Sequence, residues 1–424
     1  MRKALSILLV CALLCLCACG KAPQKEETPQ DGITGNYKAA VAAIDSGDYR
    51  TAYDLLKNET DEQSKELLSR FVFVPTTVNT NTQSGTAAWD SSATLTYNAS
   101  GDVLKLTRIY QGEVAETIYT YDNGRISTDV TTSHGITRTT EYTYDSAGRL
   151  YREHFVMADS TSEISETLST YTYDKMGNLI EEKHSSSNSE DAVHTYRYND
   201  AGKETLKRTD YAPGIWYEDE TVYYENGNVH KTIHRRWDNQ EFTTEYDEQG
   251  RLWRCWVAKN GEDPTLDTEN TYDAAGKLSQ TYYPNVGTVQ HRYNEQGWLT
   301  ETLDGANRTV YTYDSNGNCL TETRTINTAL QSEKRYTYDT QGRLSEYTIT
   351  YAGGKSETTA YVYDGYGNTL TRTYTGFSIE TGGDLAITEN VEWTVFYYPD
   401  EIPEVVQEKL DNLALPPIYG VIAC

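Results

Sequence analysis

Cysteine is scarce once the first 19 residues are set aside. The chain of 424 residues has seven cysteines, and four of them (Cys11, Cys15, Cys17 and Cys19) lie in one apolar N-terminal run. The remaining Cys255, Cys319 and Cys424 are odd in number and have no paired spacing. A disulfide framework and a cysteine-based zinc site are therefore not expected.

Positive charge is also in short supply. There are 37 Lys and Arg against 63 Asp and Glu, for a net charge of −26. So acidic a protein should repel nucleic acid and anionic lipid headgroups. Nucleic acid is excluded as a partner on this ground.

The motifs of common enzymes are missing as well. The sequence has no nucleophile elbow, phosphate loop, dinucleotide fingerprint or metalloprotease motif. His230 and His234 are too far apart on a strand to share a metal, since four residues span about 13 Å. The segment 314–318 faintly resembles a calcium loop, but turn chemistry explains it. We expect no catalytic residues, no metal and no cofactor.

What the chain has in abundance is a repeat. A tyrosine, a polar turn and a glycine recur roughly every 20 to 29 residues, a period in the range of stacked supersecondary units. The anchoring tyrosines are Tyr97, Tyr121, Tyr144, Tyr173, Tyr198, Tyr224, Tyr246, Tyr272, Tyr293, Tyr313, Tyr338 and Tyr363.

Each unit is predicted to be a β-hairpin. Alternating Tyr and Thr favour a strand, and Asp145-Ser146-Ala147-Gly148 suits a type I turn followed by a glycine bulge. Tyr144 then lies opposite Leu150, and Gly148, Gly250 and Gly342 should have positive φ. Two shorter units, 122–125 and 225–228, suit a two-residue type I′ turn, which would pair Tyr121 with Ile126 and Tyr224 with Val229.

The hairpins place Tyr and Leu on one face and Thr, Asp and Arg on the other. About 24 strands at about 4.8 Å would make a ribbon roughly 115 Å wide, and such ribbons seldom stay flat. We expect a mainly β protein, a continuous curled or spiral sheet of about twelve hairpins with the Tyr–Leu face inside.

The Y-D-x-x-G-R-L units resemble the YD repeats of Rhs and teneurin-type proteins, over about 300 residues. The resemblance implies hairpins wound as a β-spiral, here a partial YD shell. Family toxins also carry a Pro- and Asp-rich cleavage motif and a variable toxic domain. Neither is found here, where 26 residues follow Tyr398.

The N-terminus has the pattern of an export signal. Arg2 and Lys3 precede an apolar run of about 15 residues, too short for a membrane span and typical of a signal peptide over 1–18. Leu16-Cys17-Ala18-Cys19-Gly20 resembles the lipobox of bacterial lipoproteins, which implies a fatty-acylated Cys19 (such as a palmitate) on the extracytoplasmic face of a bacterial cell membrane. The alternative is an ordinary secretory signal with an incidental cysteine.

The remaining segments follow from composition and period. Residues 19–35 are predicted to be a flexible tether, and 36–72 a small N-terminal helical hairpin of tetratricopeptide-like pattern that caps the open first end of the sheet. Residues 73–90 should form a connecting strand and polar loop, 91–398 the YD-repeat spiral, and 399–424 a C-terminal tail that plugs its far end.

Five of the seven tryptophans lie between residues 216 and 298. Strand alternation places Trp256 inward with Leu252, and Trp253 and Trp298 outward, near Arg251, Arg254 and Tyr293. Such a patch could stack on a sugar or on apolar side chains of a partner. The alternative is that loops cover these tryptophans and that they serve packing.

Together these features predict a membrane-anchored, non-enzymatic cell-surface module that binds or adheres to a glycan or a protein. One alternative is a remnant or small version of an Rhs-type toxin cage or carrier, which a closed interior would favour. Another is a glycan-active enzyme, which paired carboxylates in a cleft beside Trp253 would favour.

The lipobox can be tested directly. Cys19→Ala should abolish fatty-acid labelling and release or mislocalise the protein, because the thioether to the lipid forms at that sulfur. Metabolic labelling and cell fractionation measure both effects, and unchanged labelling in the variant would refute the lipobox.

Overall fold

The structure is a computed structural model that describes residues 35–161, 163–211, 214–378 and 382–398. The expected signal peptide, Cys19, the tether up to residue 34 and the tail 399–424 lie outside these residues. The chain divides into two compact units, Met1–Ser69 and Arg70–Cys424. Each unit is described by itself.

The first unit contains three short helices, α1 (Gly35–Asp45), α2 (Tyr49–Leu56) and α3 (Glu62–Leu68). Aspartates cap two of them: Asp48 accepts from the Thr51 N–H at 3.2 Å, and Asp61 accepts from the Ser64 N–H at 2.9 Å. Ala40, Ala52 and Leu56 are buried. None of these helices has the length and apolar character needed to cross a membrane.

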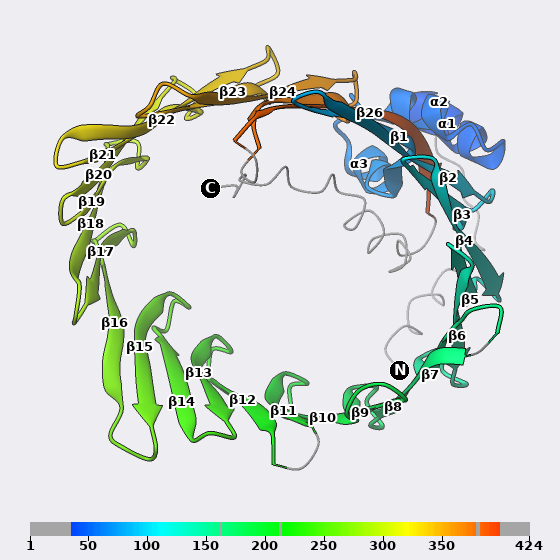
Figure 1. Ribbon diagram of the computed structural model, residues 1–424, viewed down its shortest axis with the longest axis horizontal. Helices are drawn as coiled ribbons and strands as arrows, with labels where there is room; N and C mark the ends of the chain where they lie inside the picture. Colours follow the sequence, from blue (N-terminus) through cyan, green and yellow to red (C-terminus); the bar gives the residue numbers. More distant parts are fainter. Residues whose placement is uncertain (1–34, 162, 212–213, 379–381, 399–424) are drawn as a thin grey trace, which may run out of the picture. The chain divides into compact units, whose positions relative to one another are not determined.

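The second unit is one antiparallel sheet of 26 strands in chain order (Figure 1). The strands are β1 (Phe71–Ser84), β2 (Ala87–Tyr97), β3 (Val103–Tyr110), β4 (Glu113–Asp122), β5 (Arg125–Ser133), β6 (Ile136–Tyr144), β7 (Leu150–Ala158), β8 (Glu163–Tyr173), β9 (Leu179–Ser186), β10 (Ala192–Tyr198), β11 (Glu204–Asp210), β12 (Trp216–Tyr223), β13 (Val229–Arg236), β14 (Gln240–Tyr246), β15 (Leu252–Lys259), β16 (Thr265–Tyr272), β17 (Leu278–Tyr283), β18 (Gly287–Tyr293), β19 (Leu299–Asp304), β20 (Asn307–Tyr313), β21 (Cys319–Ile326), β22 (Ala329–Tyr338), β23 (Leu344–Tyr351), β24 (Ser356–Tyr363), β25 (Thr369–Phe377) and β26 (Asp384–Tyr397).

The sheet closes on itself, and the expectation of an open curled or spiral sheet was wrong. β1 pairs with β26 from Phe71↔Tyr397 to Ser84↔Leu385, so the first and last strands are neighbours. The sheet is therefore a closed barrel, in which neither β1 nor β26 is left as a free edge strand. The sequence-predicted loop within 73–90 is also wrong, since most of that segment is the long strand β1 and the start of β2.

Buried apolar side chains support this closure. Val74 on β1 and Val391 and Val395 on β26 are at most 4% exposed. Beside this seam, Leu95, Val103, Leu106, Tyr119 and Ile126 form a cluster across β2–β5. Elsewhere most strand residues are only half-buried, since each strand makes its extensive contacts with its two hydrogen-bonded neighbours.

The predicted turn chemistry is confirmed at most repeats. The Asp145 N–H donates to the Arg149 carbonyl at 2.8 Å, and the Gly148 N–H donates to the Asp145 carbonyl at 2.9 Å. Gly148, Gly250 and Gly342 have φ of 80°, 81° and 80°. The Asn123-Gly124 pair has positive φ at both residues and joins Asp122 to Arg125, as a type I′ turn requires.

One turn departs from the prediction. Tyr223, not Tyr224, pairs with Val229, and the Tyr224 N–H donates to the Asn228 carbonyl at 2.8 Å. Residues 224–228 therefore repeat the five-residue geometry of 145–149, with Tyr224 in the place of the aspartate. The two-residue turn predicted there was wrong.

A β-bulge follows every one of the twelve repeat turns in the described sheet. In each hairpin one residue has no partner on the opposite strand. For example, Tyr144 pairs with Leu150 and Thr143 with Arg152, so Tyr151 between them is unpaired. The unpaired bulge residues are Leu104, Ser127, Tyr151, Ile180, Thr205, His230, Trp253, Ser279, Thr300, Leu320, Ser345 and Leu370. Each bulge reverses the strand alternation that follows it.

A substitution at Gly342 would test backbone strain without a steric clash, because a β-carbon added there has no atom within 4 Å. Gly342→Ala should lower the free energy of unfolding by about 1–2 kcal/mol, the cost of a left-handed non-glycine residue. Gly353→Ala is the matched control, since that glycine also faces open space but lacks a positive φ. Equal midpoints of the two variants in denaturant unfolding would argue against strain at Gly342.

Candidate functional site

In nine of the twelve repeats, a tyrosine at the end of a strand fastens its repeat to the one before it. The Tyr173 hydroxyl donates to the Leu150 carbonyl at 2.7 Å, which joins β8 to the start of β7. The same bond recurs in eight other repeats, as Tyr121–Val103, Tyr198–Leu179, Tyr223–Glu204, Tyr272–Leu252, Tyr293–Leu278, Tyr313–Leu299, Tyr338–Cys319 and Tyr363–Leu344. We call this recurring bond the tyrosine lock.

A cation from the preceding turn lies over several of the locked rings. The Arg149 guanidinium lies 4.5 Å from the centre of the Tyr173 ring, and Arg251 lies 4.4 Å from that of Tyr272. The turn aspartate orients the arginine, because Arg149 Nε donates to Asp145 Oδ2 at 2.8 Å. Hydrogen bonds from the backbone N–H of Arg149, and then from its side chain, lower the pKa of Asp145.

Three of the five residues predicted to bind a ligand take part in these locks. Arg251 covers Tyr272, and Tyr293 donates to the Leu278 carbonyl at 3.0 Å with Lys277 over its ring. Trp298 stands where other repeats have an arginine, and its ring lies 5.4 Å from that of Tyr313. Trp298 is half-buried, and its indole packs against Gly317.

The other two predicted residues contact each other at a bulge. Trp253 is 40% exposed, and the Arg254 guanidinium lies 4.0 Å from the centre of its ring. The side chains of the bulge residues Leu104 and Tyr151 are exposed to a similar degree. Strands β16, β17 and β18 separate Trp253 from Trp298, about 19 Å across the sheet, so the two do not form one patch.

The predicted orientation of Trp256 was wrong. Trp256 pairs with Thr243, which lies on the opposite face from Tyr246, because Trp253 is an extra residue in the strand. Its indole N–H donates to Glu245 at 3.0 Å. Tyr246 and Leu252 pair as predicted and are half-buried.

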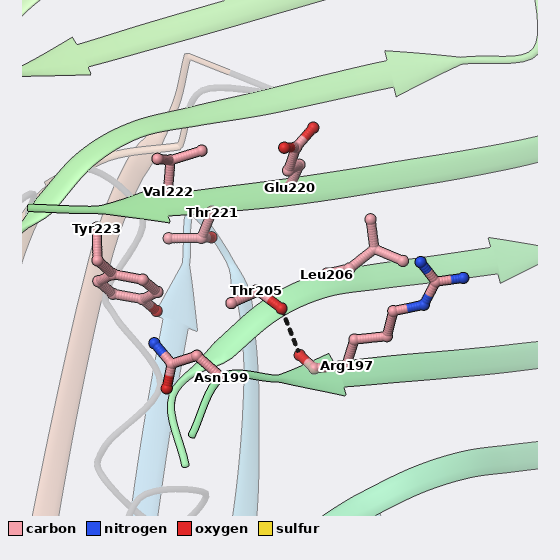
Figure 2. A pocket seen from close by; sticks show the side chains of 8 residues that line it. All are labelled: Arg197, Asn199, Thr205, Leu206, Glu220, Thr221, Val222 and Tyr223. Atoms are coloured by element: carbon pink, nitrogen blue, oxygen red, sulfur yellow. Dashed lines mark hydrogen bonds between the residues drawn. The ribbon is translucent and has the colours of Figure 1, made fainter. Parts of the chain in front are cut away.

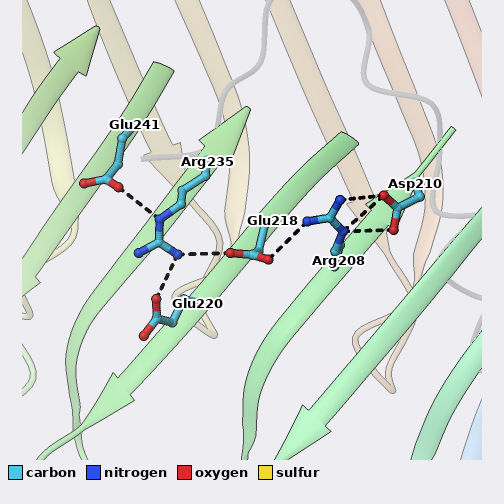
Figure 3. A network of polar contacts seen from close by, with 6 residues as sticks. All are labelled: Arg208, Asp210, Glu218, Glu220, Arg235 and Glu241. Carbon is cyan, nitrogen blue, oxygen red and sulfur yellow. Dashed lines mark hydrogen bonds and ion pairs between the residues drawn. The ribbon is translucent and has the colours of Figure 1, made fainter. Parts of the chain in front are cut away.

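A polar network crosses β11–β14, toward the strand ends that lie away from the repeat turns (Figure 3). Arg208 is bidentate to Asp210, at 2.9 and 2.7 Å, and reaches Glu218 at 3.5 Å. Arg235 contacts Glu218, Glu220 and Glu241 at 3.1, 2.8 and 3.0 Å. Two guanidiniums thus serve four carboxylates, which leaves an excess of negative charge here.

An open groove of about 420 Å³ lies beside this network, at the bulge of β11 (Figure 2). It is lined by side chains of β10–β12, and the Thr205 hydroxyl donates to the Arg197 carbonyl at 3.1 Å. Glu220 is the one carboxylate among its eight lining residues, and Arg235 neutralises it. The groove therefore lacks the pair of carboxylates that acid–base catalysis would need.

The histidines that come together are not those singled out in the sequence. His234 hydrogen bonds to Asp219 at 2.7 Å, and the His230 ring lies 4.4 Å from the Tyr224 ring. Instead, ligand atoms of Glu182, His184 and His194 lie within 4.8 Å of one another. Their spacing offers a weak signal: 182 and 184 alternate on β9, and 194 follows on β10.

Comparison with known proteins identifies the repeat. Residues 159–366 match the model of the family described as Teneurin YD-shell. This segment is a YD-shell repeat array. The resemblance drawn from the Y-D-x-x-G-R-L units is thereby confirmed. No curated protein matches the sequence.

Solved structures resemble the chain only loosely. The crystal structure of TcdB2-TccC3-TEV has 15% identity and a TM-score of 0.36, over 70% of this chain and 19% of that one. The crystal structure of TcdB2-TccC3-Cdc42 has 14% identity and a TM-score of 0.35, over 70% of this chain and 23% of that one. A porin-like protein from Bacteroides uniformis has 10% identity and a TM-score of 0.19, over 76% of this chain and 97% of that one. The chain thus spans about a fifth of the TcdB2-TccC3 chains, and at these TM-scores the likenesses support no functional argument.

The two tryptophans should differ in their effect on stability. Trp298→Ala should lower the free energy of unfolding by about 1–3 kcal/mol, because it leaves Tyr313 uncovered, whereas Trp253→Ala should stay within about 0.5 kcal/mol. Thermal unfolding of both variants measures this. If Trp253→Ala proved the more destabilising, the roles assigned to the lock and the bulge would be wrong.

Proposed function

We propose that this YD-repeat chain is a non-enzymatic holder that encloses a polypeptide inside its closed sheet. The observation that carries the proposal is the seam between β1 and β26, which makes the sheet a barrel. A closed interior favours the cage or carrier reading over an open adhesive surface.

The width of the barrel supports an enclosed volume. Twenty-six strands at about 4.8 Å give a circumference of about 125 Å and a diameter of about 40 Å, before any strand tilt. Two facing layers of side chains fill about 10 Å. The strands make their extensive contacts only with their hydrogen-bonded neighbours, so the walls do not collapse onto each other.

Charge indicates what kind of polypeptide would fit. The chain has a net charge of −26. A basic or unfolded segment would be attracted, and nucleic acid would be repelled. A lipid on Cys19 would hold this barrel on the extracytoplasmic face of a bacterial membrane.

Binding at the exposed bulge of β15 is the second candidate. Trp253 is exposed and stacked by Arg254, an arrangement that can take a sugar ring or an apolar side chain. This site is smaller than the patch expected from the sequence, because Arg251, Tyr293 and Trp298 are engaged in the locks.

Protection from protease tests enclosure. Dye-labelled polylysine mixed with the full chain should resist trypsin, because the protease cannot enter a closed barrel. Val391→Asp should abolish this protection, since it places a charge at a seam position that is 4% exposed and so opens the barrel. Leu370→Asp, at an exposed position on the neighbouring strand, is the matched control and should protect like wild type.

The outcomes separate the two candidates. Polylysine that binds but is cleaved would show surface binding and refute enclosure. Equal protection by Val391→Asp would also refute it, provided that the variant keeps its strand content by circular dichroism. Loss of sugar binding on Trp253→Ala, measured by calorimetry, would favour the second candidate.

A further inference from the structure

The clustered histidines of β9 and β10 lie on one face of the sheet. His194 pairs directly with Glu182 across the two strands, and His184 pairs with Ala192 two residues further along. Because alternate residues of a strand share a face, all three side chains project from the face of Tyr171 and Tyr196. All three are half-buried.

The second nitrogen of each histidine is already held. His184 Nδ1 lies 2.8 Å from the Ser169 hydroxyl on β8, and His194 Nδ1 lies 2.8 Å from the Thr209 hydroxyl on β11. A hydroxyl that accepts from Nδ1–H leaves the Nε2 lone pair available. Metal-bound histidines are fixed in this way by an outer hydrogen bond.

The carboxylate is oriented in the same manner. Glu182 Oε1 lies 2.9 Å from His184 Nε2, and Glu182 Oε2 accepts from the Tyr196 hydroxyl at 3.1 Å. The two imidazole rings are 5.3 Å apart and nearly perpendicular, so they do not stack on each other.

We propose that Glu182, His184 and His194 form a zinc site on β9 and β10. Two imidazoles and one carboxylate are a ligand set that Zn²⁺ accepts, with water in the fourth position. Tetrahedral coordination at about 2.1 Å puts ligand atoms about 3.4 Å apart, so no pair need close by more than about 1.4 Å, and Glu182 Oε1 and His184 Nε2, now 2.9 Å apart, would separate slightly. Side-chain rotation suffices for such a shift.

The ion would join two strands that share a short ladder. β9 and β10 pair through only the four positions from Glu181↔Thr195 to His184↔Ala192. The hydroxyls of Ser169 and Thr209 extend the site to β8 and β11, so four successive strands would be tied together. Zinc should therefore raise the thermal midpoint of the barrel.

Calorimetric titration of the full chain with ZnCl₂ tests the site, after its thiols are alkylated to remove cysteine as a ligand. We expect one equivalent to bind. Ser169→Ala and Thr209→Val should each weaken binding about 10–100-fold, and His184→Ala, His194→Ala and Glu182→Gln by at least as much. His234→Ala is the matched control, since His234 also pairs with a carboxylate but belongs to no group of three potential ligands in the described part of the chain, and this variant should bind zinc like wild type.

The proposal is overturned if wild type binds no zinc, or if affinity is unchanged in His184→Ala and His194→Ala. Circular dichroism establishes that each variant is folded. Should the alanine variants unfold, the milder Glu182→Gln, Ser169→Ala and Thr209→Val decide, because unchanged affinity in all three also refutes the site.

Discussion

The pairing of β1 with β26 is the contact on which the rest of this structure depends. An antiparallel sheet with free edges exposes rows of N–H and carbonyl groups that recruit other chains, and closure removes both rows. The seam is apolar around Val74, Val391 and Val395, and next to it the buried pair Arg372–Glu389 joins β25 to β26 at 3.4 Å. Without the seam the same hairpins would form a ribbon with no interior.

The repeat and its register could be predicted from the sequence because their causes are local. A turn glycine recurs in all twelve hairpins, and in six of them a leucine follows two residues later, as at Gly148 and Leu150. The twelve hairpins account for β2 to β25. The two strands that close the barrel carry no such turn, and the Thr- and Asn-rich end of β1 has the composition of a loop. Their pairing joins residues more than 300 positions apart, which leaves no local signal.

The face of each tryptophan was harder to predict, for a different reason. The bulge after every turn is set by backbone geometry, and the residue in it varies from Ser127 to His230 to Trp253. No residue type marks the position, so simple alternation assigned Trp256 to the wrong face. The turn at 224–228 was also predicted wrongly, because Tyr223 and Tyr224 are adjacent and either could pair with Val229.

Function in such an array should be sought away from its turns. The turn ends are committed to the tyrosine locks, which explains why Arg251, Tyr293 and Trp298 look conspicuous in the sequence yet serve the fold. The parts of the strands away from these turns take no part in the locks, so the side chains there can vary without changing the strand register. The arginine–carboxylate network of β11–β14 and the histidines of β9 and β10 both lie away from the repeat turns, on opposite faces of neighbouring strands, since Arg208 pairs with Thr195 and His194 with Thr209. A scaffold that is fixed at its turns can therefore differ on its two faces, with acidic pairs on one and clustered histidines on the other, within the six strands β9–β14.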